Sequence, residues 1–405
     1  MAHSHHDDDQ HAGCGCNAGR RDFLLDMLAA GGLAALGLSG AGPALAQPDD
    51  EVVRIGYIPI TDATPLLVAH AEGYFADEGL EAAEPTLIRG WSPLVEAFAS
   101  QRFNLVHLLK PIPIWMRYRN DFPVKIMGWA HINGSGVVAG RHVEAESIAD
   151  LGGTQVAVPY WYSMHNVILQ MALREAGLKP VIKSLSDELA PDEVNLSVLP
   201  PPEMPTALAS RKIDAFIVAE PFNAAGELLA GGRMLRFTGD MWRNHPCCVL
   251  CMNENQVQQR PEWTQRVMNA LVRAENHAQN DKREVARMLS RDGRGYLPMP
   301  AKVVERAMTH YGPANYPDAI QHDDWGSGRI DFNPWPYPSA TRFIVDAMNR
   351  TLVGGDTTFL KEVDPAFAAD DLVDYEFVRR AMEKYPVAGF SESANPWERE
   401  EVIRL

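Results

Sequence analysis

Polar and aromatic side chains follow the ends of several predicted strands in this 405-residue sequence. In open α/β sheets, loops and helix N-termini meet at the carboxyl ends of the strands, and ligands bind there. Side chains at these positions could therefore hydrogen-bond to a small molecule or stack on it. The candidate ligand-binding residues are Thr61, Asp62, Trp91, Lys110, Ser135, Tyr160, Trp161, His165, Glu220 and Cys248.

The same residues have purely structural alternatives. Asp62 or Thr61 could cap a helix that starts near Pro65. Glu220 could brace a hinge without touching a ligand, and small buried cysteines such as Cys248 are usually core residues. An ordinary role in the core or on the surface is also open for Trp91, Lys110 and His165.

Common catalytic motifs are missing from the sequence. There is no nucleophile elbow, Walker loop, dinucleotide-binding glycine pattern or metalloprotease helix. The segment Cys247-Cys248-x-x-Cys251 lacks a second pair at zinc-ribbon spacing, so it is a weak metal signal. We therefore expect a protein with no catalytic residue, no metal ligand and no cofactor.

The elements that must position the candidate residues alternate along the chain. Alternating β-branched and apolar residues predict strands at 52–58, 81–88, 103–109, 124–130, 154–158, 194–199, 215–219 and 247–252. Helical patterns fall between them at 66–72, 93–100, 162–176 and 202–210. This order predicts α/β architecture with parallel sheets covered on both faces by helices. Residues 262–405 are predicted to be mostly helical, with helices at 263–280, 301–309, 340–350 and 375–384.

Composition and charge exclude several classes of protein. Hydrophobic residues make up 46% and charged residues 22%, which is typical of a globular protein and not of a disordered or fibrous one. The net charge of −16 disfavours binding to nucleic acid, which needs a basic surface. The densest basic cluster, residues 283–294, is interrupted by Glu284 and Asp292. We therefore expect no nucleic-acid partner.

The first 46 residues have the pattern of an export signal. Arg20 and Arg21 form a twin-arginine pair, and a short apolar run rich in glycine and alanine follows at 27–38. That run is shorter than the about 20 residues that span a membrane. Pro43-Ala44-Leu45-Ala46 supplies a small-x-small cleavage site. We expect twin-arginine export to the periplasm with cleavage near Ala46; a buried N-terminal helix is the alternative.

Histidines and cysteines before the twin arginines form a second motif. The tract from His3 to Cys16 could bind a soft metal ion, but cleavage at Ala46 would remove it. Three cysteines would then remain, at 247, 248 and 251. An odd number of thiols, two of them adjacent, does not predict a disulfide framework.

Three segments are similar to one known family. They are Arg54-Ile55-Gly56-Tyr57 with Thr61-Asp62-Ala63-Thr64-Pro65-Leu66, then Ala71-Glu72-Gly73-Tyr74-Phe75 with Glu78-Gly79-Leu80, and Ala215-Phe216-Ile217-Val218-Ala219-Glu220-Pro221-Phe222. Over most of residues 52–275 the sequence resembles the periplasmic solute-binding proteins of ABC importers for nitrate, bicarbonate, alkanesulfonates, taurine and thiamin pyrimidine precursors.

The resemblance implies a type II periplasmic-binding-protein fold, in which two lobes with doubly wound sheets close on one small solute. We expect lobe 1 to comprise residues 52–138 and 250–405, including a helical C-terminal extension, and lobe 2 to comprise residues 139–249. The resemblance also implies a binding role without catalysis and delivery of the solute to an ABC permease at the inner membrane. We expect a monomer.

Within the nitrate and bicarbonate branch, the resemblance places Trp91, Lys110, Ser135 and His165 in the cleft. Nitrate binders usually carry glutamine where this chain has Ser135, and a ligand-facing lysine where it has Cys248. Loss of a charge-assisted contact costs roughly 1.5–3 kcal/mol, which disfavours nitrate unless Lys110 restores the charge. The aromatic residues Trp91, Tyr160, Trp161 and Tyr162 would suit a flat organic solute instead.

Two other functions stay open at this point. The same fold hosts a thiamin-pyrimidine synthase family with a cysteine-rich strand, which the Cys247–Cys251 segment resembles faintly but without the run of consecutive cysteines. A metal-handling receptor is the other alternative, suggested by the histidines of the leader.

Overall fold

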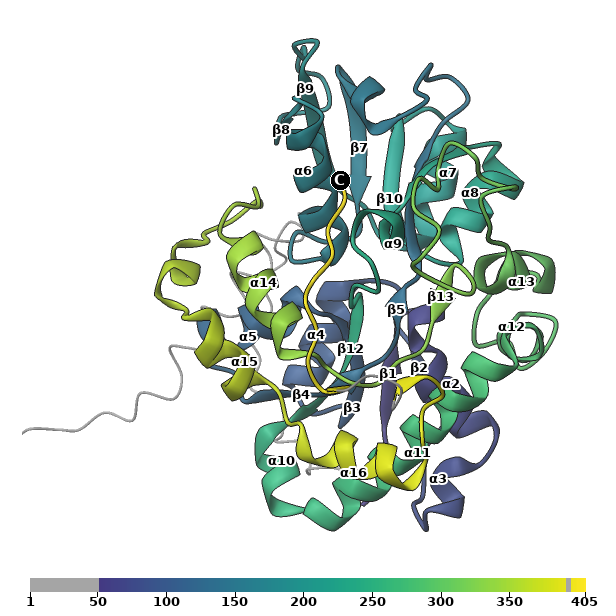
Figure 1. The fold of residues 1–405 in the computed structure, drawn as a ribbon, viewed down its shortest axis with the longest axis vertical. Coiled ribbons are helices and arrows are strands. Elements are labelled where there is room, and N and C mark those ends of the chain that lie inside the picture. Colours follow the sequence, from purple (N-terminus) through teal and green to yellow (C-terminus); the bar gives the residue numbers. More distant parts are fainter. Residues whose placement is uncertain (1–50, 391–394) are drawn as a thin grey trace, which may run out of the picture.

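The computed structural model of the protein describes residues 51–390 and 395–405. Two main sheets lie one beyond the other, with the short strands β5 (Ile132–Asn133) and β13 (Ile330–Asp331) between them (Figure 1). The predicted export signal, its cleavage site and the His3–Cys16 tract lie outside the described residues. No described helix is both long and apolar enough to cross a membrane.

The first sheet has five strands in the order β2-β1-β3-β12-β4. Its strands are β1 (Ile55–Tyr57), β2 (Thr86–Leu87), β3 (Leu105–Leu109), β4 (Val124–Trp129) and β12 (Cys248–Asn253). β1, β2 and β3 are parallel, whereas β12 is antiparallel to β3 and β4. The connecting elements are η1 (Thr61–Ala63), α2 (Thr64–Ala71), α3 (Tyr74–Asp77), α4 (Trp91–Ala99) and α5 (Pro111–Asn120).

The second sheet has six strands in the order β11-β6-β10-β7-β9-β8. Its strands are β6 (Ser135–Ala139), β7 (Thr154–Val158), β8 (Lys179–Val181), β9 (Glu193–Val198), β10 (Ala215–Ala219) and β11 (Arg233–Phe237). The connecting elements are η2 (Ile148–Leu151), α6 (Met164–Glu175), η3 (Pro201–Glu203), α7 (Met204–Ala209) and α8 (Phe222–Ala230). β7, β8, β9 and β10 are parallel, and β6 is antiparallel to β10 and β11.

The chain passes between the sheets at β5–β6 and again from β11 through α9 (Thr238–Met241) to β12. A strand that enters a sheet directly, without a crossover helix, runs against its neighbours. The prediction of parallel sheets is therefore wrong for β6 and β12, which run antiparallel to their neighbours. The pairing also corrects the expected lobe boundaries. Residues 135–138, expected in lobe 1, lie in the second sheet, and Cys248 and Val249, expected in lobe 2, lie in the first.

The C-terminal third contacts both sheets. Its helices are α10 (Glu254–Gln259), α11 (Pro261–Asn280), α12 (Lys282–Leu289), α13 (Ala301–Thr309), α14 (Pro338–Met348), η4 (Thr358–Glu362), α15 (Pro365–Leu372) and α16 (Glu376–Lys384). α11 packs on α2 and α16 beside the first sheet, whereas α13 packs on α8 beside the second (Figure 1). The final residues run along the crossing segment, where the Arg404 N–H donates to the Met241 carbonyl at 2.8 Å. The extension thus spans the junction of the two sheets.

Candidate functional site

The carboxyl ends of β1, β3 and β4 face the carboxyl ends of β7 and β10, and β6 and β12 begin at the same junction. All ten candidate residues lie at or near this junction, and none has more than 7% of its surface exposed. The structure therefore holds the two sheets closed over the candidate site.

Asp62 and His131 form the centre of a polar group at the junction. Asp62 lies in η1 after β1, and its Oδ2 atom is 2.8 Å from Nε2 of His131, which follows β4. The backbone N–H of Cys248 approaches the same imidazole nitrogen at 3.3 Å. Asp62, His131 and Cys248 are completely buried. Neither carboxylate oxygen of Asp62 has a hydrogen-bond partner in good geometry among the described residues.

Ser135, His165 and Cys247 extend this group across the junction. His165 lies on the first turn of α6, and its Nε2 atom is 2.9 Å from Ser135 Oγ and 3.8 Å from Cys247 Sγ. The helix starts there because the hydroxyl of Ser163 accepts a hydrogen bond from the N–H of Asn166. His165, which follows β7 of the second sheet, thus contacts Cys247, which precedes β12 of the first.

Burial and close contacts change the acidity of these groups. Burial raises the pKa of Asp62. Burial alone would lower the pKa of His131, but attraction to Asp62 raises it to about 10. Burial would likewise raise the pKa of Cys247, yet its contacts with Cys248 and His165 hold it well below the ordinary value, while burial raises the pKa of Cys248. The junction therefore holds the charged form of His131 and favours a thiolate at Cys247.

Two aromatic candidates, Trp91 and Tyr160, lie at the start of α4. Trp91 is its first residue, and Tyr160 approaches the helix from the end of β7 in the second sheet. Trp91 opens that helix and contacts the ring of His107 edge-on, with centroids 5.7 Å apart. Tyr160 follows β7 and lies beside Ser92 and Glu96, and burial raises its pKa to about 12. The indole N–H of Trp91 and the hydroxyl of Tyr160 are both buried without a partner in good geometry. Tyr160 thus lies beside the residue that follows Trp91, and no ring contact between the two aromatic side chains is found among the described residues.

Two other candidates point away from this group. Nζ of Lys110 donates to Thr341 of α14 at 2.9 Å, and burial lowers the pKa of this amine to about 7. The charges that act on it belong to Cys251 and Glu401, so Lys110 faces the C-terminal third. The indole of Trp161 lies against Gly354, where an added Cβ would approach Nε1 to 2.7 Å.

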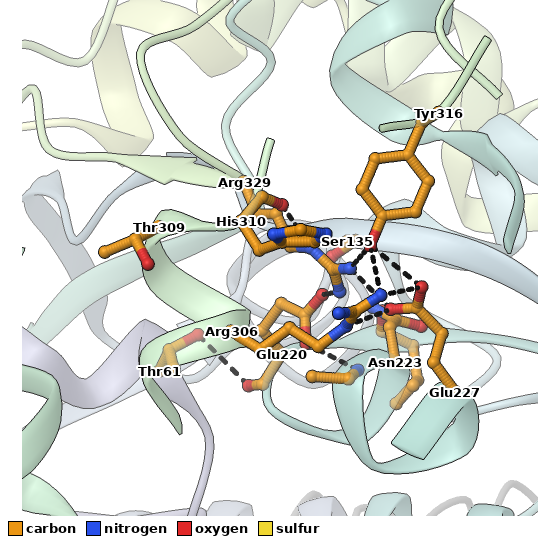
Figure 2. A network of polar contacts seen from close by, with 12 residues as sticks. Thr61, Ser135, Glu220, Asn223, Glu227, Arg306, Thr309, His310, Tyr316 and Arg329 are labelled. Atoms are coloured by element: carbon orange, nitrogen blue, oxygen red, sulfur yellow. Dashed lines mark hydrogen bonds and ion pairs between the residues drawn. The ribbon is translucent and has the colours of Figure 1, made fainter. Parts of the chain in front are cut away.

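Glu220 and Thr61 belong to a separate buried network (Figure 2). The Glu220 carboxylate accepts hydrogen bonds from Arg329 Nη1 at 2.8 Å and from the Ala224 N–H at 3.0 Å. Its backbone carbonyl accepts from the N–H of Thr61 at 2.8 Å and from the Thr61 hydroxyl at 3.1 Å. Glu220 therefore has the bracing role that the sequence left open as its alternative.

Arg329 is the centre of that network. Its guanidinium lies 5.1 Å from the ring centroid of Tyr316 and 5.2 Å from that of Phe237, and it also pairs with Glu227. Arg306 reaches Glu227 at 3.0 Å, and Figure 2 shows both arginines converging on the same carboxylate. Every charged group of this network has an oppositely charged partner.

Sequence reasoning missed His131 and Arg329, and it named Cys247 without choosing it as a site residue. His131 comes two residues after the end of β4, so the strand-end rule could have identified it. Arg329 comes from an irregular segment more than 100 residues after Glu220, and no spacing in the sequence connects the two.

A family model described as NMT1-like matches residues 46–290. The chain belongs to the NMT1-like family. The nitrate/nitrite binding protein NrtA of Nostoc sp. (strain PCC 7120) is 24% identical over 331 residues, which are 76% of this chain and 69% of that protein.

Solved structures share the fold at low sequence identity. The periplasmic nitrate-binding protein NrtA from Synechocystis PCC 6803 superposes with a TM-score of 0.73 at 18% identity, covering 87% of this chain and 94% of that one. A ligand-binding component of an ABC-type import system from Staphylococcus aureus, solved with zinc bound, gives 0.64 at 18%, covering 82% and 98%. These matches confirm the predicted fold class.

Proposed function

We propose that this protein is the extracytoplasmic substrate-binding component of an ABC importer. It captures a small solute between two lobes and delivers it to a permease at the inner membrane. Lobe 1 contains the first sheet and lobe 2 the second, and the chain crosses between them near Gly134 and Cys247. The family membership and the names of the relatives support a binding role without catalysis.

One observation carries the proposal: buried polar atoms without partners gather where the two sheets meet. They include the Asp62 carboxylate, the Trp91 indole N–H, the Tyr160 hydroxyl and His165 Nδ1. Each such group costs about 1–3 kcal/mol when it is buried without a hydrogen bond. A solute that supplied the missing partners would bind the closed form better than the open one, and would therefore drive closure.

The charges of the site favour one of the two solute classes that the sequence left open. Lys110 is held by Thr341 and does not face Cys248, so it does not replace the lysine of the nitrate binders. Asp62 offers a carboxylate acceptor to a solute that donates a hydrogen bond, and its charge is opposed by His131 at 2.8 Å. We propose a small planar organic solute that donates a hydrogen bond to Asp62 and lies against Trp91 and Tyr160.

We also propose that the protein is exported by the twin-arginine pathway, is cleaved near Ala46 and acts in the periplasm as a monomer. Mass spectrometry of protein purified from the periplasm should give an N-terminus near Gln47, and size-exclusion chromatography with light scattering should give the mass of one chain. A retained leader or a stable dimer would contradict these points.

The solute-binding role is tested with mature protein that is reduced and treated with a chelator. Melting temperatures and titration calorimetry are measured against pyrimidines, alkanesulfonates, taurine, nitrate and bicarbonate. One organic compound should raise the melting temperature and bind one per chain, and nitrate should not. If no compound in the panel changes the melting temperature, the proposed function is contradicted.

A matched pair of variants then tests the position of the solute. Trp91→Phe should weaken binding about tenfold, which corresponds to about 1.4 kcal/mol of lost contact. Trp161→Phe is the control, because that indole lies against Gly354 and away from the polar group. Equal effects of the two substitutions would contradict the proposed position.

A further inference from the structure

Four side chains at the junction bring their donor atoms close together. Asp62, His131, Cys247 and Cys248 each offer one donor atom, and these four atoms lie within 4.8 Å of one another. All four residues are completely buried. The donors come from three separate segments, after β1, after β4 and at the start of β12, so the fold and not a local motif brings them together.

The group is incomplete as it stands. Both carboxylate oxygens of Asp62 and the Nδ1 atom of His131 have no hydrogen-bond partner in good geometry among the described residues. The Nε2 atom of His131 cannot serve both of its neighbours, because one needs a hydrogen-bond acceptor and the other a donor. The Cys248 N–H at 3.3 Å needs an acceptor, whereas the Asp62 carboxylate at 2.8 Å needs a donor or a cation.

The chemistry of the donor set selects the class of ligand. Two sulfurs, one imidazole nitrogen and one carboxylate oxygen are the atoms by which proteins hold zinc in four-coordinate sites. Thiolates disfavour the hard cations magnesium and calcium, which bind through oxygen. A divalent cation would also bind the Asp62 carboxylate, which in the described structure has His131 at 2.8 Å but no hydrogen bond of good geometry.

We propose that Asp62, His131, Cys247 and Cys248 form a binding site for one divalent transition-metal ion, for which zinc is the best match. His165, with Nε2 at 3.8 Å from Cys247 Sγ, borders the site from the second sheet. This proposal differs from the expectation, drawn from the sequence, that the protein has no metal ligand. The proposal rests on the donors of this chain and not on the Staphylococcus structure, whose 18% identity shows the fold alone.

Zinc binding is tested with the full mature protein, reduced and stripped by a chelator. Titration against a competing chromophoric chelator should give one tightly bound zinc per chain. Substitution with cobalt should give a thiolate-to-cobalt charge-transfer band and the visible ligand-field bands of a tetrahedral site. Cys248→Ser should weaken zinc binding at least about 100-fold, since a lost ligand costs more than a lost supporting contact.

Cys251→Ser is the matched control. Cys251 is equally buried on the same strand, but it lies near Lys110 and outside the donor group, so its substitution should leave the zinc affinity unchanged. If Cys248→Ser fails to fold, the cobalt spectrum of the unsubstituted protein decides whether the metal is bound through thiolates.

Folded, reduced protein that binds no zinc, or a cobalt spectrum without a thiolate band, would overturn the proposal. Equal losses in the Cys248 and Cys251 variants would do the same. The proposal does not rest on the transport role. The solute panel is run in chelator and the zinc titration without solute, so failure of one is distinguishable from failure of the other.

Discussion

Two buried polar groups lie at the junction of the sheets, and they differ in whether they are complete. In the Arg329 network, both oxygens of Glu220 are hydrogen-bonded, and Glu227 is paired with Arg306 and Arg329. Around Asp62, the carboxylate has no hydrogen bond of good geometry, and the polar atoms of Trp91 and Tyr160 lack partners as well. Asp62 and Glu220, the central carboxylates of the two groups, are completely buried.

This difference separates a structural role from a binding role. A buried network in which every charge is paired stabilises one arrangement of the chain. A buried group with missing partners costs stability until something supplies them. The first group therefore holds the crossing segments in place, and the second is where a solute or an ion gains binding energy.

The largest expected effect follows from breaking the complete network. Arg329→Met should lower the free energy of unfolding by about 3–5 kcal/mol, because it leaves two carboxylates buried without their main partner. Arg306→Met is the control: this side chain is 26% exposed and shares Glu227 with Arg329, so about 1 kcal/mol should be lost. Urea denaturation measures both. If Arg329→Met is no less stable than the control, the network does not brace the junction.

Lys110 sharpens the comparison, because it has one partner, Thr341, but remains a buried amine. Its pKa in the folded protein is lowered to about 7, so the folded state loses its proton before the unfolded state does. Stability should therefore rise as pH increases from 7 to 10.5, and the full cost of the charge is present below pH 7.

Lys110→Met should remove that cost. At pH 6 the variant should be about 3 kcal/mol more stable than the original protein, allowing for the lost hydrogen bond. The advantage should shrink by pH 10. Urea denaturation at both pH values would contradict the account if the stability difference did not depend on pH.

Asp62→Asn tests the incomplete group. The affinity for the organic solute should fall about 30-fold, since about 2 kcal/mol is lost with a charged hydrogen bond, while stability should change far less than in Arg329→Met. The pKa of His131 should fall from about 10, because burial remains when the carboxylate is gone and only the smaller effect of Cys247 still raises it. NMR titration of the His131 ring measures this pKa. An unchanged value would show that Asp62 does not control His131.

The smallest expected effect concerns the contact between the Thr61 hydroxyl and the Glu220 carbonyl. Thr61→Val keeps the shape of the side chain and removes the hydroxyl, so about 1 kcal/mol of stability should be lost with no change in solute affinity. Thermal denaturation and calorimetry measure the two quantities. A large loss of affinity would place Thr61 in the binding group instead.

Local patterns were sufficient to predict much of the fold and part of the site. The strands at 154–158 and 215–219 and the helix at 301–309 have the predicted bounds, because their apolar spacing is decided locally. The strand-end rule placed Asp62, Trp91, Tyr160 and His165 at the junction, where the structure has them, since the carboxyl ends of parallel strands meet at one edge. Their role in binding stays a prediction.

The directions of Lys110 and Trp161 could not be predicted in the same way. Both side chains turn toward the C-terminal third, at Thr341 and Gly354, and no local pattern shows where that region packs. The antiparallel strands β6 and β12 depend on where the chain crosses between sheets, and the pairing of Arg329 with Glu220 depends on contacts more than 100 residues apart.

The most direct test of the binding role is a titration in which the solute is recovered afterwards. Reduced, chelator-treated protein is titrated with the panel compound that raises its melting temperature, and the compound is then released by denaturation and analysed by mass spectrometry. The account predicts binding of one molecule per chain and recovery of the compound chemically unchanged. Conversion of the compound, or the absence of saturable binding, would contradict it.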